Sequence, residues 1–127
     1  MVDDLKYLQR GGRVSKTAAT LGSMLDLKPV LVETREGKLE AVTKQRGRKK
    51  AMSYIIEQGL ANLDDPEECE FIVLHADCYD DAVKLRDALL EKEPRLKLLI
   101  EPIGPVIGAH AGPGTLAFCF LGKERAH

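Results

Sequence analysis

Hydrophobic residues alternate with polar ones in several segments of the chain, which is the pattern of β-strands. Alternation on either side of Gly37 predicts a β-hairpin made of 29–34 and 38–44. Short apolar segments predict further strands at 71–76, 96–100 and 116–121. The last of these is apolar on both faces, which predicts that it lies inside a sheet.

Apolar residues at helical spacing predict helices between and before these strands. A short helix over 2–10 ends at the pair of glycines that follows it, and Ser15 is placed to cap a second helix. Longer helices begin near Arg48 and Asp80. The strand, helix and strand within 71–100 predict a βαβ unit, which should cross over right-handed if its two strands lie parallel in one sheet.

These elements predict an α/β fold of the two-layer α+β kind, with a mixed β-sheet and helices packed mainly on one face. The sheet is expected to contain the segments around Leu31, Val42, Val73, Leu98 and Phe118. A chain of 127 residues fits one core, so residues 1–127 are expected to form a single domain.

Composition excludes several classes of protein. Lysine and arginine number 19 against 20 acidic residues, so no overall field attracts nucleic acid. The apolar runs are far shorter than the roughly 20 residues of a membrane span, and no signal peptide is evident. Cys69, Cys78 and Cys119 have no paired spacing, which favours reduced thiols. We therefore expect a soluble, cytoplasmic protein without a membrane span or a nucleic-acid partner.

The segment 101–114 carries the strongest sign of binding chemistry. Its four glycines and three prolines predict a shaped loop instead of a helix, with His110 at its centre. Gly108 and Gly112 would let the backbone approach a ligand and turn N–H groups toward an anion, and the imidazole adds a donor. The segment predicts an anion or carboxylate site. The alternative is a rigid crossover whose histidine bonds a neighbouring carbonyl.

A second candidate is the basic run that opens the helix at Arg48. Arg46, Arg48 and the two lysines after them lie where the helix dipole disfavours cations. The run therefore indicates an anion to meet it, or else a solvated charged face. Arg13, between Gly12 and Ser15, either faces a ligand or is a solvated arginine at a helix end.

The sequence gives little support for metal binding or for catalysis. His75 and Cys78 form one loose pair, whereas a structural zinc site needs two clean pairs, so no metal is expected. No serine–histidine–aspartate pattern, phosphate-binding loop or nucleotide fingerprint is present. We expect neither a cofactor nor catalysis by this chain.

Five stretches, in this order, resemble the DegV family of bacterial fatty-acid-binding proteins. They are Leu8-Gln-Arg-Gly-Gly-Arg-Val-Ser15, Leu27-Lys-Pro-Val-Leu31, Arg46-Gly-Arg-Lys-Lys-Ala51, His75-Ala-Asp77 and Ile103-Gly-Pro-Val-Ile-Gly-Ala-His-Ala-Gly-Pro-Gly114. The resemblance covers nearly the whole chain. It implies the C-terminal domain of a two-domain protein, without the N-terminal domain whose hydroxyl residues bind the fatty-acid carboxylate. Ala111 departs from the family, where a hydroxyl residue is often found.

The resemblance also implies a site and partners. Arg13, Arg46 or Arg48, and His110 would gather on one exposed face to bind the head group of a long-chain fatty acid, which is then presented to a fatty-acid kinase. Ala18, Leu21 and Met24, on the helix expected after Ser15, fit one wall of a fatty-acyl tunnel or an ordinary core almost equally well.

Two functions follow from these expectations. The first is a fatty-acid-binding half-module that binds weakly alone and buries its tunnel-facing surface in a homodimer. The alternative is a non-binding interaction or regulatory domain that has lost its ligand-binding partner domain.

Overall fold

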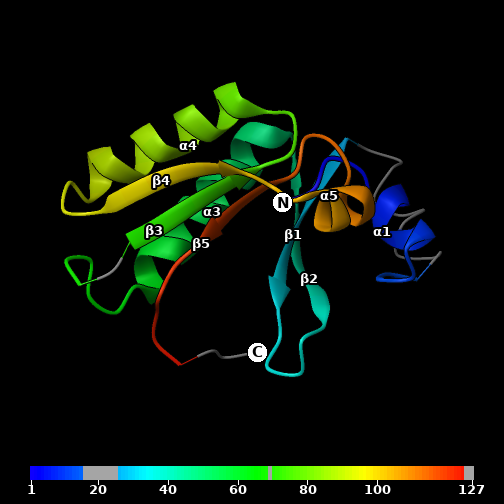
Figure 1. The fold of residues 1–127 in the computed structure, drawn as a ribbon, viewed down its shortest axis with the longest axis horizontal. Helices are drawn as coiled ribbons and strands as arrows, with labels where there is room; N and C mark the ends of the chain where they lie inside the picture. Colours follow the sequence, from blue (N-terminus) through cyan, green and yellow to red (C-terminus); the bar gives the residue numbers. More distant parts are fainter. Residues whose placement is uncertain (16–25, 69, 125–127) are drawn as a thin grey trace.

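The structure, a computed structural model, describes residues 1–15, 26–68 and 70–124. The helix predicted after Ser15, with Ala18, Leu21 and Met24, lies outside these residues. The elements in Figure 1 are α1 Lys6–Arg10, β1 Leu27–Glu33, β2 Leu39–Arg46, α3 Arg48–Asn62, β3 Glu70–His75, α4 Tyr79–Lys92, β4 Lys97–Pro102, α5 Pro105–Ala111 and β5 Leu116–Cys119.

The predicted hairpin is confirmed. β1 and β2 pair antiparallel from Leu27 opposite Arg46 to Glu33 opposite Leu39. Gly37, in the connecting turn, has φ of 73°, a value that glycine adopts without strain.

The βαβ unit is confirmed as well. β3 and β4 are parallel, with α4 between them in the sequence, and β5 pairs antiparallel with β3. These strands form a mixed sheet in the order β4-β3-β5. The prediction that the strand near Phe118 lies inside the sheet was wrong, because β5 is at an edge and β3 is central. Apolar residues on both faces of a segment concern what lies above and below the sheet, and they carry no information about neighbours along the sheet.

The expectation of one sheet was also wrong, since β1 and β2 form a separate sheet. The first residues of the chain connect the two. The Met1 amine donates to the Leu116 carbonyl of β5, and the Val2 amide donates to the Pro29 carbonyl of β1. Figure 1 shows the N-terminus between β5 and β1. The alternation of apolar and polar residues correctly predicted which residues form strands. It could not predict which strands pair, because pairing depends on contacts between distant segments.

The helix predicted over 2–10 is shorter than expected. α1 begins at Lys6, whose amide donates to the Asp4 carboxylate at 2.8 Å. Asp3 therefore lies outside the first turn of the helix. Its carboxylate is free to contact other elements.

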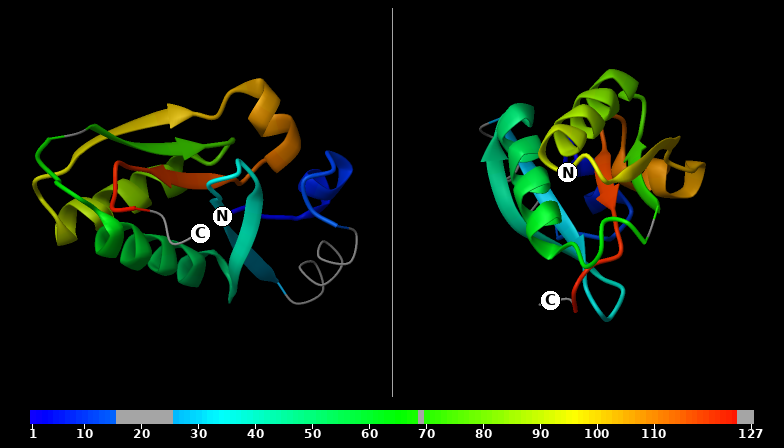
Figure 2. Two further views of the ribbon diagram at one scale, coloured as in Figure 1. Left: turned by 90° about the horizontal axis from the view of Figure 1, so that it is seen from below. Right: turned by 90° about the vertical axis from the view of Figure 1, so that its left-hand side faces the viewer.

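The main core lies between the three-stranded sheet and two helices. Phe71, Val73, Leu85, Leu89 and Leu116 are completely buried there. Each such side chain contributes about 1.5–3 kcal/mol of burial free energy. Figure 2 shows α3 and α4 on one side of this sheet, as predicted, and α5 on the other side.

A second, smaller cluster holds α1 against α5. Val2, Leu5, Leu8 and Ala111 are buried in it. Ala111, where the family often has a hydroxyl residue, is thus an apolar contact in this chain. None of the helices within the described ranges is long and apolar enough to cross a bilayer.

Candidate functional site

The glycine- and proline-rich segment contains a helix, so the prediction of a loop without one was wrong. Pro105 is the first residue of α5, where a missing N–H costs nothing and the fixed φ suits a helix. Gly112, with φ of 84°, ends the helix. The segment therefore presents His110 on a short rigid helix.

The amides of the two candidate glycines are engaged within this helix. Gly108 N donates to Gly104 O at 2.8 Å, and Gly112 N donates to Gly108 O at 2.8 Å. Gly112 leaves room for Tyr7, since a Cβ there would lie 2.4 Å from the ring, whereas a Cβ on Gly108 would meet only Ile103 at 4.0 Å. Whether either glycine contacts a ligand stays a prediction.

His110 has a defined tautomer and one ring nitrogen left for a ligand. Its Nδ1 lies 2.8 Å from Val106 O. Because a carbonyl only accepts hydrogen bonds, Nδ1 carries the proton. Nε2 is then an acceptor in the neutral ring and a donor in the charged ring, and it has no hydrogen-bond partner among the described residues. Nε2 can accept from a carboxylic acid or, when protonated, donate to a carboxylate.

Gly11 brings Arg13 to the same corner. A Cβ on Gly11 would lie 2.3 Å from Cδ2 of His110, so the imidazole rests directly against the α1 backbone. Arg13 Nη1 donates to Gly11 O at 2.6 Å, and its side chain is exposed. The structure thus places Arg13 and His110, which are far apart in the sequence, on two sides of one residue.

Arg48 has internal partners. Its Nε donates to Asp81 Oδ2 at 2.8 Å, and its Nη1 donates to Asp3 Oδ1 at 2.9 Å and to Gly114 O at 2.7 Å. A Cβ on Gly114 would crowd both Asp3 and this guanidinium. Arg48 therefore fastens the turn after α5 to the starts of α3 and α4.

The ionisation of these groups reflects the same contacts. Burial disfavours the charge on Arg48, but the hydrogen bonds that it donates to the Asp3 and Asp81 carboxylates outweigh burial and raise the pKa of Arg48. Burial likewise opposes the charge on Asp3, and contacts with Arg48 and Lys28 lower the pKa of its carboxyl below the usual value. These acids supply the negative charge that the basic helix start requires.

Arg46 is placed differently. It is exposed at the end of β2, opposite Leu27 of β1. Within the part of the chain that the structure describes, its side chain forms no ion pair. A role for Arg46 or Arg48 in binding the head group stays a prediction.

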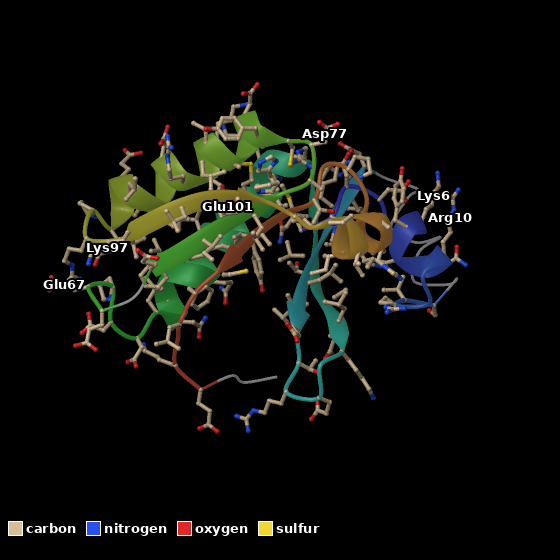
Figure 3. All side chains as sticks on the ribbon, in the orientation of Figure 1. Lys6, Arg10, Glu67, Asp77, Lys97 and Glu101 are labelled. Atoms are coloured by element: carbon tan, nitrogen blue, oxygen red, sulfur yellow. The ribbon has the colours of Figure 1, made fainter. Side chains whose placement is uncertain are left out.

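Two cations lie on α1, the helix that packs against α5, and one of them, Lys6, is paired with Asp4 at 3.5 Å. Figure 3 shows Lys6 and Arg10 on this helix, beside α5 and at the opposite end of the molecule from Glu67 and Lys97. The Arg10 guanidinium lies 5.9 Å from the centre of the Tyr7 ring. Together with Arg13, these cations would favour an anionic head group or an acidic partner near α5.

The second part of the candidate site is the face of the three-stranded sheet turned away from α3 and α4. We call it the open face. Alternate residues of each strand point to it, and those that are apolar and at least partly exposed are Ile72, Leu74, Leu99, Ala117 and Cys119. Leu99 is 45% exposed, and Val106 and Ile107 on α5 are 73% and 63% exposed. This sheet face and the adjoining helix offer apolar surface to a tail or to another protein.

A hollow of about 420 Å³ lies where β3 leads into α4, and its lining includes no residue of α5. It is lined by His75, Asp77, Cys78, Tyr79, Asp80, Asp81 and Lys84. The Cys78 Sγ lies 3.3 Å from Thr115 O, and burial raises the pKa of this thiol, which disfavours the reactive thiolate. No group of side chains suited to a metal occurs in the described part of the chain.

Several of these features were missed by sequence reasoning. Asp3 and Asp81 were not recognised as partners of Arg48, although the excess of cations at a helix start indicated that acids were needed. The open face was signalled by the two apolar faces of 116–121, which were interpreted as a central strand.

The fold and site define a class of protein: an α+β domain with one sheet face that is free of helices α3 and α4, and with a histidine and an arginine next to Gly11. The family model described as "Uncharacterised protein, DegV family" matches residues 1–123. A DegV domain-containing protein of Clostridium perfringens is 43% identical over 124 residues, which are 98% of this chain and 43% of that protein. The chain belongs to the DegV family.

Solved structures agree with this assignment. A DegV family protein from Thermus thermophilus, described as binding fatty acid, is 37% identical with a TM-score of 0.76, over 92% of this chain and 42% of that one. The Streptococcus pneumoniae fatty acid kinase B3 protein loaded with linoleic acid has a TM-score of 0.82 at 21% identity, over 94% of this chain and 42% of that one, and so shows the shared fold. The chain spans less than half the length of these proteins.

Proposed function

We propose that this chain is a fatty-acid-binding half-module, which supplies an apolar face and a head-group corner to a site completed by a companion domain. The observation that carries the proposal is the open face, on which Leu99 is 45% exposed. Fatty-acid binding by the Thermus thermophilus relative supports the same ligand class.

The head group would bind at the corner between α1 and α5. His110 Nε2 and the Arg13 guanidinium, both next to Gly11, offer hydrogen bonds and positive charge to one carboxylate. The acyl tail would extend over Leu99 and Ala117. Arg48 would act indirectly, by fixing the turn after α5.

Binding by the isolated chain should be weak. A tail of about sixteen carbons would gain roughly 12 kcal/mol if fully enclosed, at about 0.8 kcal/mol for each methylene. One open face supplies about half of this. The remainder, about 6 kcal/mol, falls within the estimated 4–15 kcal/mol cost of association.

The module presents its ligand instead of transforming it. A carboxylate held at the exposed corner of α1 and α5 stays accessible to a kinase, as family resemblance implies. Lys6, Arg10 and Arg13 would attract the acidic surface or nucleotide of that kinase. The unpaired thiols of Cys78 and Cys119 suit action in the cytoplasm.

Titration with decanoate, a fatty acid short enough to stay monomeric, tests the proposal by NMR. We expect weak, saturable shifts centred on the signals of His110, Arg13 and Leu99. Leu99→Asp should abolish these shifts, because covering a carboxylate on the open face with the apolar tail would remove its hydration at a high cost in free energy. Leu39→Asp is the matched control, since Leu39 is similarly exposed at 39% but lies on β2.

The proposal fails if the shifts spread over all exposed apolar residues, or if both variants lose them equally. If no site responds to decanoate while the chain still binds a protein through the open face, the non-binding interaction domain is the better description.

A further inference from the structure

β4 is an edge strand, and the backbone groups on its outer side are unpaired. The Ile103 amide, just after β4, donates to His75 O of β3 at 2.8 Å. Because backbone groups alternate in direction along a strand, Leu99 also faces β3, while Leu98 and Ile100 face outward. Within the described ranges, no recorded hydrogen bond satisfies the outward N–H and C=O groups of these two residues. Such an edge is a template for another strand.

The side chains of β4 are sorted between its two faces. Leu98 and Ile100 pack against the main core. Lys97, Leu99 and Glu101 lie on the open face, and all three are exposed. Figure 3 shows Lys97 at one end of β4 and Glu101 toward the other. Neither charged side chain forms an ion pair with another of the described residues, so the exposed face of β4 reads lysine, leucine, glutamate with both charges available.

This pattern is complementary to itself when two copies of β4 run antiparallel and are centred on Leu99. Leu98 of one copy then lies opposite Ile100 of the other, and these two residues exchange both of their outward hydrogen bonds on each side of the two-fold axis. Leu99 lies opposite Leu99 of the second copy, and Lys97 lies opposite Glu101. These are the positions between hydrogen-bonded pairs, where opposed side chains approach most closely.

Other alignments of the two strands fit less well. Pairing centred on Leu98 would place Leu99 opposite Lys97, and pairing centred on Ile100 would place it opposite Glu101, so an apolar side chain would meet a charge in both. Many edge strands carry charges that keep a second copy away. The charges of β4 have opposite signs and equal spacing from Leu99, so they attract a second copy in one register.

We propose that the outer edge of β4 is an interface between two copies of this chain, which pair antiparallel about Leu99 and join their three-stranded sheets into one continuous sheet. Main-chain hydrogen bonds supply the recognition, as in other cases of strand addition, and the paired lysine and glutamate set the register. The proposal is independent of fatty-acid binding and is tested without a ligand.

Exchange of charges between Lys97 and Glu101 tests the interface by sedimentation. Lys97→Glu sets two glutamates against each other, and Glu101→Lys sets two lysines against each other, so each variant alone should dimerise about tenfold more weakly than the wild type or worse. An equimolar mixture of the two variants should restore dimerisation, because every glutamate at the interface then meets a lysine. Lys44→Glu, an exposed lysine on β2, is the matched control and should leave the dimer intact.

Amide hydrogen exchange, measured by NMR, identifies the backbone groups that pair. In the dimer, exchange at Leu98 and Ile100 should slow by about fivefold or more, as a new hydrogen bond implies. Leu99, whose amide already faces β3, is the internal reference. A dimer that leaves both outward amides unprotected would be formed through the open faces and would overturn the proposal. A wild-type chain that is monomeric at every concentration, a mixture that is no more dimeric than either variant, or equal weakening by Lys44→Glu would overturn it as well.

Discussion

Arg48 decides how several distant segments meet. Its guanidinium contacts carboxylates from the start of the chain and from α4, and a carbonyl from the turn after α5. The side chain is 25% exposed, so water screens these contacts only in part. Its removal takes away the cation that Asp3 and Asp81 share and leaves each with one lysine, Lys28 for Asp3 and Lys84 for Asp81.

We predict that Arg48→Ala lowers the free energy of unfolding by about 2–3 kcal/mol, because two carboxylates lose their shared partner. Arg46→Ala, two residues away and exposed, should change it by less than about 0.5 kcal/mol. Urea unfolding followed by circular dichroism measures both. Similar values for the two variants would show that the Arg48 network contributes little.

The Met1 amine predicts how stability depends on pH. Its pKa is about 5 in the folded chain, against an ordinary value of 8.0. Between these values the unfolded chain binds a proton that the folded chain does not. The free energy of unfolding should therefore rise with pH across this window, by up to about 1.4 kcal/mol for each pH unit.

Acetylation of the Met1 amine gives the control for this prediction. The acetylated chain has no amine to protonate, so the difference in stability between the two forms should be largest near the lower end of the window and vanish above its upper end. Urea unfolding at a series of pH values measures this difference. A difference that is constant with pH would contradict burial of the amine.

At the scale of elements, the contact between α1 and α5 depends on the absence of a side chain at Gly11. The φ of Gly11 is −79°, which any residue can adopt, so only the His110 ring excludes a larger residue there. The contact between the two helices can therefore be tested by adding a side chain at Gly11.

Gly11→Ala should destabilise the chain by about 1–3 kcal/mol, since its Cβ would overlap the imidazole. In the background of His110→Ala, the same change should cost much less, because the space is then open. A double-mutant cycle in urea measures this coupling. Gly104→Ala is the control, with nothing within 4 Å of the added Cβ and an ordinary φ of −62°. Equal costs in the two backgrounds would argue against contact between His110 and Gly11.

For the whole molecule, the open face predicts self-association. Apolar surface such as that around Leu99 is commonly covered by another protein, and two-fold pairs are the commonest solution. We predict that the chain sediments as a homodimer at protein concentrations of roughly tens of micromolar. Leu99→Glu should shift the chain to monomer, whereas Leu39→Glu should leave the dimer intact. A wild-type monomer under these conditions would contradict the prediction.

The sequence alone determined most of the local structure. The hairpin around Gly37, the helices from Arg48 and from Tyr79, and the parallel strands on either side of the latter all follow from periodicity, because a strand or helix records in its own residues which face is buried. Local sequence singled out His110, in the glycine- and proline-rich segment, and Arg13, next to Gly12, and the structure brings both of them to Gly11.

Tertiary structure decided the rest. Whether β5 lies inside or at the edge of a sheet, and whether Arg48 meets a ligand or the carboxylates of Asp3 and Asp81, depends on segments far apart in the chain. Proline and glycine around His110 exclude a helix interior but permit a helix that begins at Pro105 and ends at Gly112, so local composition misled there. The pattern of apolar residues within a segment indicates which of its faces is buried. The partner of a strand and the counter-ion of a charged side chain come from distant segments, so they are decided only when the whole chain folds.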